Sequence, residues 1–150
     1  MKYLLVLVSI VILFSFSTLS QECINYHKDF CPLPDYSFYY DQQSKGLDMF
    51  VGDKIRINII FYASTDYYLS VCGHRKFKII QFQIIDPDSK RILYDNAGED
   101  YVDNIIIKNK NTRNLIVEVS IPRELNKVKK NYLNILFQYF THKAKDKTLH

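Results

Sequence analysis

The chain contains no tryptophan among its 150 residues, and it shows no set of side chains arranged for catalysis. Without tryptophan, the strongest platform for stacking a sugar ring is absent. Nucleophilic catalysis requires a nucleophile, a base and an orienting group within hydrogen-bond reach, and no such set stands out. The histidines His27, His142 and His150 have no spacing typical of metal ligands. These absences argue against an enzyme and indicate no cofactor.

The first 20 residues have the layout of a secretory signal peptide. A short basic start precedes a mostly apolar run of 17 residues at positions 3–19. Thr18 and Ser20 supply the small side chains that cleavage requires, which would leave Gln21 as the new N-terminus. We therefore expect an exported protein that is periplasmic, associated with the outer membrane or extracellular, where thiols can oxidise.

Two alternatives to cleavage remain open. A run of 17 residues lies at the lower edge of the range of about 17–25 that spans a bilayer, so an uncleaved anchor is one of them. Lipidation of Cys23 is the other, but this cysteine follows Glu22 and lies too far beyond the apolar run.

Charge is unevenly distributed along the predicted mature chain, whose 130 residues suffice for one domain. Residues 21–122 hold 12 Lys and Arg against 14 Asp and Glu, whereas residues 123–150 hold 7 against 2. The basic tail at 141–150 could make weak contact with an anionic surface through Lys143, Lys145 and Lys147, or it could simply be solvated. No nucleic-acid partner is expected, because no recognisable binding motif is present.

The three cysteines are an odd number for an exported chain. Cys23 and Cys31 enclose seven residues just after the cleavage site, and we expect a disulfide between them that leaves Cys72 as a buried free thiol. Pairing of Cys72 with Cys23 or Cys31 is the competing arrangement, and the sequence does not decide between them.

Strand patterns separated by turn signals fill most of the chain, and no segment predicts a long amphipathic helix. We expect strands at 54–61, 67–72, 77–85, 91–94, 101–108, 114–121 and 132–140. Three of them alternate clearly, and their expected inward residues are Ile55, Ile57, Ile59 and Phe61, then Leu115, Val117, Val119 and Ile121, then Leu133, Ile135, Phe137 and Tyr139.

The pattern predicts an all-β protein with a single, jelly-roll-like β-sandwich of about seven to eight strands. The sandwich occupies residues 48–140 and follows an extended N-terminal strap at 21–47 that could add an edge strand. The alternation slips between Ile79 and Ile80, which predicts a β-bulge there. Residues 123–130 could form one helical turn.

Residues 46–122 carry a series of short motifs that resembles a known group. In order they are Gly52-Asp53, the stretch FYASTDYYLSVC at 61–72, IQFQIID at 80–86, LYDN at 93–96 and LIVEVSIP at 115–122. This series is similar to a largely uncharacterised group of small exported β-sandwich proteins of Bacteroidetes-type bacteria. A looser similarity connects it to jelly-roll modules of secreted peptidases. The resemblance implies a fold and an envelope location, and not a reaction.

Two chemical sites were weighed against simpler structural explanations. Cys72 and His74 would share a strand face, which suggests a hydrolase with a thiol nucleophile, but a packed cysteine beside a surface histidine explains the pattern better. Calcium binds several oxygen ligands from neighbouring loops, and the weak candidates are Asp86, Asp88, Asp95 and Asp100. Since these aspartates also form turns, we predict no metal site.

Twelve tyrosines and ten phenylalanines give a high aromatic content, and part of it must fill the core. Tyr36, Tyr39, Tyr40, Tyr67 and Tyr101 are the tyrosines that we expect could face water and form an interface. The sequence therefore favours a non-catalytic binding or accessory module that contacts an envelope or secreted protein of unknown identity. A carbohydrate-binding module that takes a glycan is the first alternative, and the thiol hydrolase is the second.

Overall fold

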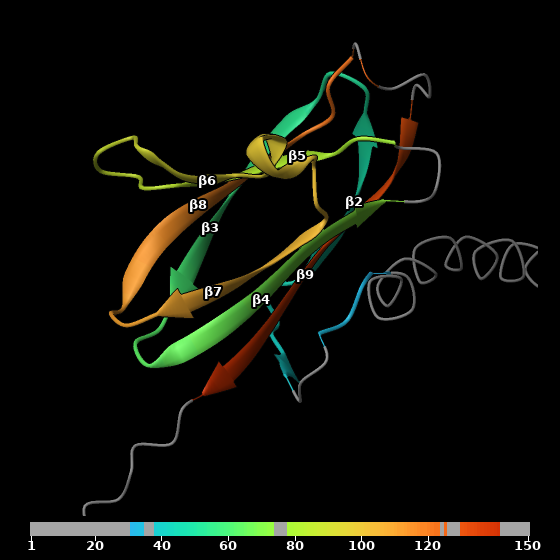
Figure 1. Ribbon diagram of the computed structural model, residues 1–150. Helices are drawn as coiled ribbons and strands as arrows, with labels where there is room; N and C mark the ends of the chain where they lie inside the picture. Colours follow the sequence, from blue (N-terminus) through green and yellow to red (C-terminus); the bar gives the residue numbers. More distant parts are fainter. Residues whose placement is uncertain (1–30, 35–37, 74–77, 124, 126–129, 142–150) are drawn as a thin grey trace, which may run out of the picture.

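The protein folds into two antiparallel β-sheets that pack face to face (Figure 1). This computed structural model describes residues 31–34, 38–73, 78–123, 125 and 130–141. Sheet A contains β1 (Tyr39–Tyr40), β2 (Lys45–Phe50), β9 (Lys130–Thr141), β4 (Thr65–Gly73) and β7 (Asn104–Asn109). Sheet B contains β3 (Lys54–Phe61), β8 (Arg113–Ser120), β5 (Gln81–Ile85) and β6 (Ile92–Asp95). A 3-10 helix, η1 (Asn96–Glu99), follows β6.

The strand order is that of a jelly roll. Sheet A runs β2-β9-β4-β7 and sheet B runs β3-β8-β5-β6, so from β2 onward the chain changes sheet at every step except from β5 to β6. Eight strands wound in this way form two Greek keys. The short β1 pairs with β9 beyond the start of β2 and brings the total to nine strands within the described residues. The prediction of a jelly-roll-like β-sandwich is confirmed.

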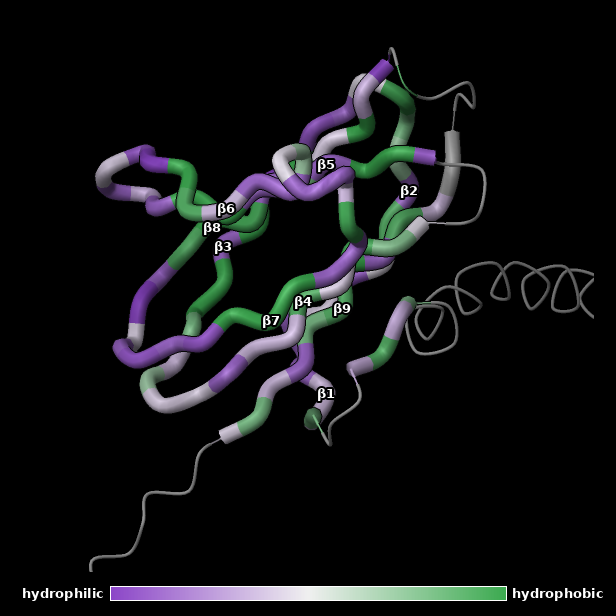
Figure 2. Tube along the Cα trace, viewed as in Figure 1, coloured by the Kyte–Doolittle hydropathy of each residue, from purple (hydrophilic) through white to green (hydrophobic). Residues whose placement is uncertain are grey.

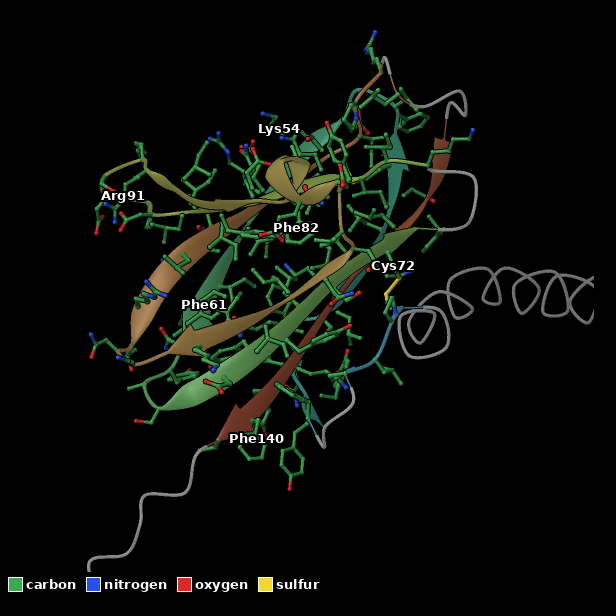
Figure 3. The ribbon with its side chains drawn as sticks, viewed as in Figure 1. Lys54, Phe61, Cys72, Phe82, Arg91 and Phe140 are labelled. Carbon is green, nitrogen blue, oxygen red and sulfur yellow. A yellow bond between two sulfur atoms is a disulfide. The ribbon has the colours of Figure 1, made fainter. Side chains whose placement is uncertain are left out.

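The core lies between the sheets because alternate residues of each strand point inward. The inward residues predicted for β3, β8 and β9 all lie in the core cluster or pack against it, so these three predictions are confirmed. Figure 3 shows Phe61 and Phe82 between the sheets, with Lys54 and Arg91 outside. Hydrophilic residues gather instead at the outer turns, as between β5 and β6 (Figure 2).

The predicted bulge at Ile79 and Ile80 is wrong. β5 begins only at Gln81, which pairs with Ser120, the last residue of β8. Residues 79 and 80 therefore precede the strand in which the bulge was expected. The register shift lies between Ile84 and Ile85, where β5 pairs with β6.

Several predicted features lie outside the described residues. They are the signal peptide at 1–20, residues 124 and 126–129 of the expected helical turn, Cys23, Tyr36, His74 and the tail lysines Lys143, Lys145 and Lys147. Within the part of the chain that is described, no helix is long and apolar enough to cross a membrane.

Candidate binding surface

The predicted disulfide between Cys23 and Cys31 is wrong, because Cys31 is bonded to Cys72 across 41 residues of sequence. The outward face of β4 explains this pairing. Cys72 points away from the core, and the segment that begins at Cys31 lies against the same face, with 5.3 Å between the two Cα atoms. Cys72 is therefore not a free thiol, and it cannot serve as the nucleophile of the hydrolase that the sequence left open.

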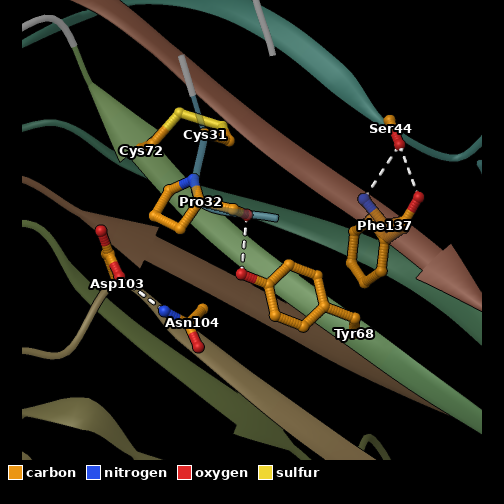
Figure 4. Close-up of a disulfide and its surroundings, with 8 residues drawn as sticks. All are labelled: Cys31, Pro32, Ser44, Tyr68, Cys72, Asp103, Asn104 and Phe137. Carbon is orange, nitrogen blue, oxygen red and sulfur yellow. Dashed lines mark hydrogen bonds between the residues drawn. A yellow bond between two sulfur atoms is a disulfide. The ribbon is translucent and has the colours of Figure 1, made fainter. Parts of the chain in front are cut away.

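The segment from Cys31 is held against sheet A by more than its disulfide. The hydroxyl of Tyr68 donates a hydrogen bond of 2.6 Å to the carbonyl of Pro32 (Figure 4). The ring of Phe38 lies 6.1 Å from those of Tyr68 and Phe140, measured between centroids. Cys31, Tyr68, Cys72 and Leu136 form a second apolar cluster on the outer face of sheet A, and Phe38 packs against it.

Buried polar atoms on this same outer face lack hydrogen bonds within the described part of the chain. They are Ser70 Oγ, both amide atoms of Asn134 and the side-chain oxygen of Gln138. Ser70 and Asn134 are fully buried. A buried polar group that stays unpaired costs about 1–3 kcal/mol.

The outer face of sheet B is built differently. A row of polar residues crosses the sheet, in the pairing order Arg56, Glu118, Gln83 and Asp95. Glu118 accepts from Arg56 at 2.6 Å and from Lys54 at 2.8 Å, and Asp95 accepts from Gln83 at 2.6 Å. Both carboxylates therefore have hydrogen-bonding partners within their own sheet.

A pocket of about 470 Å³ opens at the end of the sandwich where β9 ends and β4 begins. We call it the tyrosine pocket. Its lining comes from the β1 end and the turn after it, the β3–β4 turn, β4 and β9, namely Tyr40, Asp41, Gln42, Tyr62, Thr65, Tyr67, Tyr139 and Thr141. One further ring lies close by, that of Tyr39, whose centroid is 5.8 Å from that of Tyr139.

The backbone at Tyr62 is fixed on both sides. Its N–H donates to the hydroxyl oxygen of Tyr67 at 2.9 Å, and its carbonyl accepts from the amide of Asn109 at 2.6 Å. The next N–H, that of Ala63, donates to Thr112 Oγ1 at 3.0 Å. The side chain of Tyr62 is nevertheless 57% exposed. The β3–β4 turn thus presents an exposed aromatic ring from a rigid backbone.

The turn between β1 and β2 places Asp41 in the lining. Asp41 N–H donates to the carbonyl of Phe137 at 2.9 Å, which ties the turn to β9. Its carboxylate accepts from the backbone and the side chain of Gln43. Ser44 completes the turn, because its hydroxyl bonds both the N–H and the carbonyl of Phe137 (Figure 4).

The hydroxyl of Tyr67 lies at the buried base of the pocket. Burial raises the pKa of this phenol, and the negative charge of Asp41 raises it further, against the lowering effect of the N–H that it accepts from Tyr62. The phenol is therefore neutral at physiological pH. Its ring packs edge-on against Phe61 at 4.8 Å, which anchors the base of the pocket in the core.

The structure brings together some of the tyrosines proposed for an interface and separates others. Tyr39 and Tyr40 lie at the tyrosine pocket and are 64% and 39% exposed. The prediction that Tyr67 faces water is wrong, because its side chain points inward with Leu69 and Val71 and is 1% exposed. Tyr101 is half-buried and lines a different pocket of about 410 Å³ beside Cys72. The sequence analysis missed Asp41, Tyr62 and Tyr139.

The four aspartates considered for calcium act in turns or at exposed positions. Backbone N–H groups of Ser89 and Asp88 bond the carboxylate of Asp86 and hold its pKa below the usual range. Asp95 caps η1 by accepting from the N–H of Ala97, and Asp100 ends this helix in the left-handed region. Among the described residues, no group of three or more His, Cys, Asp or Glu side chains could hold a metal ion.

Comparisons with known proteins add little beyond the architecture. A scan against family models found no match, and a search of curated proteins found no significant one. Among solved structures, the chain is similar to PliG of Aeromonas hydrophila, a periplasmic inhibitor of g-type lysozyme. The TM-score is 0.47 and the identity 11%, over 65% of this chain and 87% of that one. A likeness this distant bears on no function, so the site is interpreted from its own residues.

Proposed function

We propose that this chain is an exported, non-catalytic binding module that contacts a protein partner through the tyrosine pocket and the rings around it. The observation that carries the proposal is Tyr62, whose backbone is bonded at its N–H and its carbonyl while its ring is exposed. A backbone held in this way loses little conformational freedom when a partner covers the ring, which favours affinity.

The side chains around the pocket have the composition of a protein interface. Tyrosine is enriched at the energetic centres of interfaces because it offers a large contact area and one polar group. Tyr39, Tyr40 and Tyr62 are exposed at this end of the sandwich. Such a concentration of exposed rings costs solubility when it is left bare, which supports a partner that covers it.

Two features support a location outside the cytosol. The predicted signal peptide supplies an export route. The Cys31–Cys72 disulfide suits an oxidising compartment. The partner that we propose is accordingly an envelope or secreted protein.

Glycan binding is the second candidate function, and the lining of the pocket is what favours it. Asp41 and Gln42 stand beside tyrosine rings, and such groups can hydrogen-bond sugar hydroxyls while the rings stack on the sugar. The ring outside the pocket favours the protein partner, because a small sugar would leave Tyr39 uncovered.

Site-specific photo-crosslinking in the native cells tests the proposal. Benzoylphenylalanine placed at position 62 should yield one discrete adduct with another protein, because this residue is exposed and lines the tyrosine pocket. The matched control is position 92 in β6, which is also about half exposed but lies outside the tyrosine pocket. An adduct of twice the chain's own mass would show self-association instead, and equal labelling from positions 62 and 92 would contradict the proposal.

A further inference from the structure

The tyrosine pocket is lined by aromatic rings and a single charged side chain. Of the eight described residues that line it, Asp41 alone carries a formal charge, and it is negative. The other seven are four tyrosines, two threonines and a glutamine. The pocket therefore offers negative charge and several aromatic rings.

We propose that the tyrosine pocket accepts one positively charged side chain, an arginine or a lysine, from the protein partner. This inference rests on the proposed function and adds the chemistry by which the partner is recognised.

Aromatic rings select cations because the face of each ring is electronegative. A cation within about 6 Å of a ring centroid is attracted to it, and several rings together form a cage. Arginine suits such a site best, since its planar guanidinium stacks on rings while its N–H groups bond a carboxylate. Tyr40, Tyr62 and Tyr139 come from three separate segments around the opening, so that rings line it from more than one side.

The carboxylate that would meet the cation is already in position. Asp41 is tied to β9 through its backbone N–H, and Gln43 donates to both of its carboxylate oxygens. A carboxylate oxygen accepts more than one hydrogen bond, so a guanidinium can still bind it. An anionic group would meet repulsion from the same carboxylate.

The base of the pocket adds an acceptor without adding charge. The buried hydroxyl of Tyr67 takes the N–H of Tyr62, and its raised pKa keeps it neutral. A neutral phenol oxygen can accept a further hydrogen bond or donate its own proton. A volume of about 470 Å³ lies within the range of small-ligand sites, which is ample for one long side chain.

A titration of the isotope-labelled protein with Nα-acetyl-arginine amide, followed by NMR, tests the inference directly. We expect chemical-shift changes confined to residues 40–42, 62, 65, 67, 139 and 141. The matched probe is Nα-acetyl-citrulline amide, which has nearly the same shape and no charge. It should bind about tenfold more weakly, which corresponds to the loss of one favourable charge contact.

Three variants of the pocket and one control outside it separate the contribution of the charge from that of the rings. Asp41→Asn retains an oxygen for the N–H of Gln43 and should weaken arginine binding about tenfold, whereas Asp88→Asn in the β5–β6 turn should leave it unchanged. Tyr62→Phe keeps the ring and should retain binding, whereas Tyr62→Leu should lose most of it. Because the Tyr62 side chain is exposed, both variants should fold, which the dispersion of the same spectra checks.

The outcomes distinguish this inference from the proposed function. Equal binding of the arginine and citrulline probes, or binding of a methyl glycoside at these residues with no response to arginine, would overturn the cation site. A protein adduct from position 62 would leave the proposed function standing in either case. If arginine binds selectively but no adduct forms, the cation site stands and the protein-binding function falls.

Discussion

The outer faces of the two sheets differ in how their polar side chains are paired. On sheet B, the carboxylates of Glu118 and Asp95 have hydrogen-bonding partners within the sheet. On sheet A, Ser70 and Asn134 are buried without hydrogen bonds in the described part of the chain, a disulfide holds the covering segment in place, and exposed rings gather at one end. Sheet B thus pairs its carboxylates within its own strands, whereas sheet A is covered by a disulfide-bonded segment, and we propose that the end of sheet A with the exposed rings contacts the partner.

Removal of the disulfide that holds the covering segment on sheet A should have the largest effect on stability. The double substitution Cys31→Ser with Cys72→Ser should lower the free energy of unfolding by about 4 kcal/mol, because the bond closes a loop of 41 residues in the unfolded chain. Chemical denaturation monitored by circular dichroism measures the change. Cys23→Ser is the matched control and should leave stability unchanged. A loss as large for Cys23→Ser would support the pairing that the sequence analysis preferred.

A substitution of Glu118 tests whether the row of polar residues on sheet B stabilises the fold. Burial alone would raise the pKa of Glu118, but hydrogen bonds from Lys54 and Arg56 outweigh burial and hold it below the usual range. A carboxyl with a lowered folded-state pKa stabilises the fold above its unfolded pKa, and this stabilisation is lost as pH falls through the folded value. Glu118→Gln should therefore cost about 1 kcal/mol at pH 7.

The pH dependence gives the sharper readout for Glu118. Between pH 7 and 5 the wild-type chain should keep the advantage over Glu118→Gln, and below the ordinary value of 4.5 the two unfolding free energies should converge. A constant difference across this range would show that the carboxylate charge does not stabilise sheet B.

A substitution of Ser70 tests whether a buried hydroxyl on sheet A lowers stability, and it should change the free energy of unfolding least. If its hydroxyl lacks a partner, Ser70→Ala removes a buried polar group at no cost and should raise the free energy of unfolding by about 0.5–1 kcal/mol. Thermal and chemical denaturation measure the gain. A loss of more than about 1 kcal/mol would reveal a hydrogen bond from another part of the chain.

The sequence was sufficient for the sandwich and its core, because alternation reports which face of a strand is buried. The residues of β3, β8 and β9 were assigned to the correct face for this reason. Alternation also predicts that Tyr67 points into the core, because it shares its face of the strand with Leu69 and Val71. The continuous apolar run at 67–72 concealed it, since both faces of β4 are covered.

The disulfide and the pocket could not be predicted in the same way. The partner of Cys72 depends on where the segment at Cys31 lies against sheet A, and no local pattern encodes that placement. Asp41, Tyr62 and Tyr139 meet only because β1, β3 and β9 end at the same edge of the sandwich. Exposed tyrosines at the ends of strands were the signal available, and by itself that signal does not show which of them meet.

The affinity of the captured partner for two variants tests the central claim most directly. Tyr62→Ala removes a ring at the tyrosine pocket, and Asn58→Ala removes an exposed side chain of β3 in sheet B. We predict that Tyr62→Ala weakens binding at least about tenfold, Asn58→Ala changes it less than about twofold, and both keep the melting temperature of the wild type. Equal affinities for the two variants, or a larger loss for Asn58→Ala, would contradict the account.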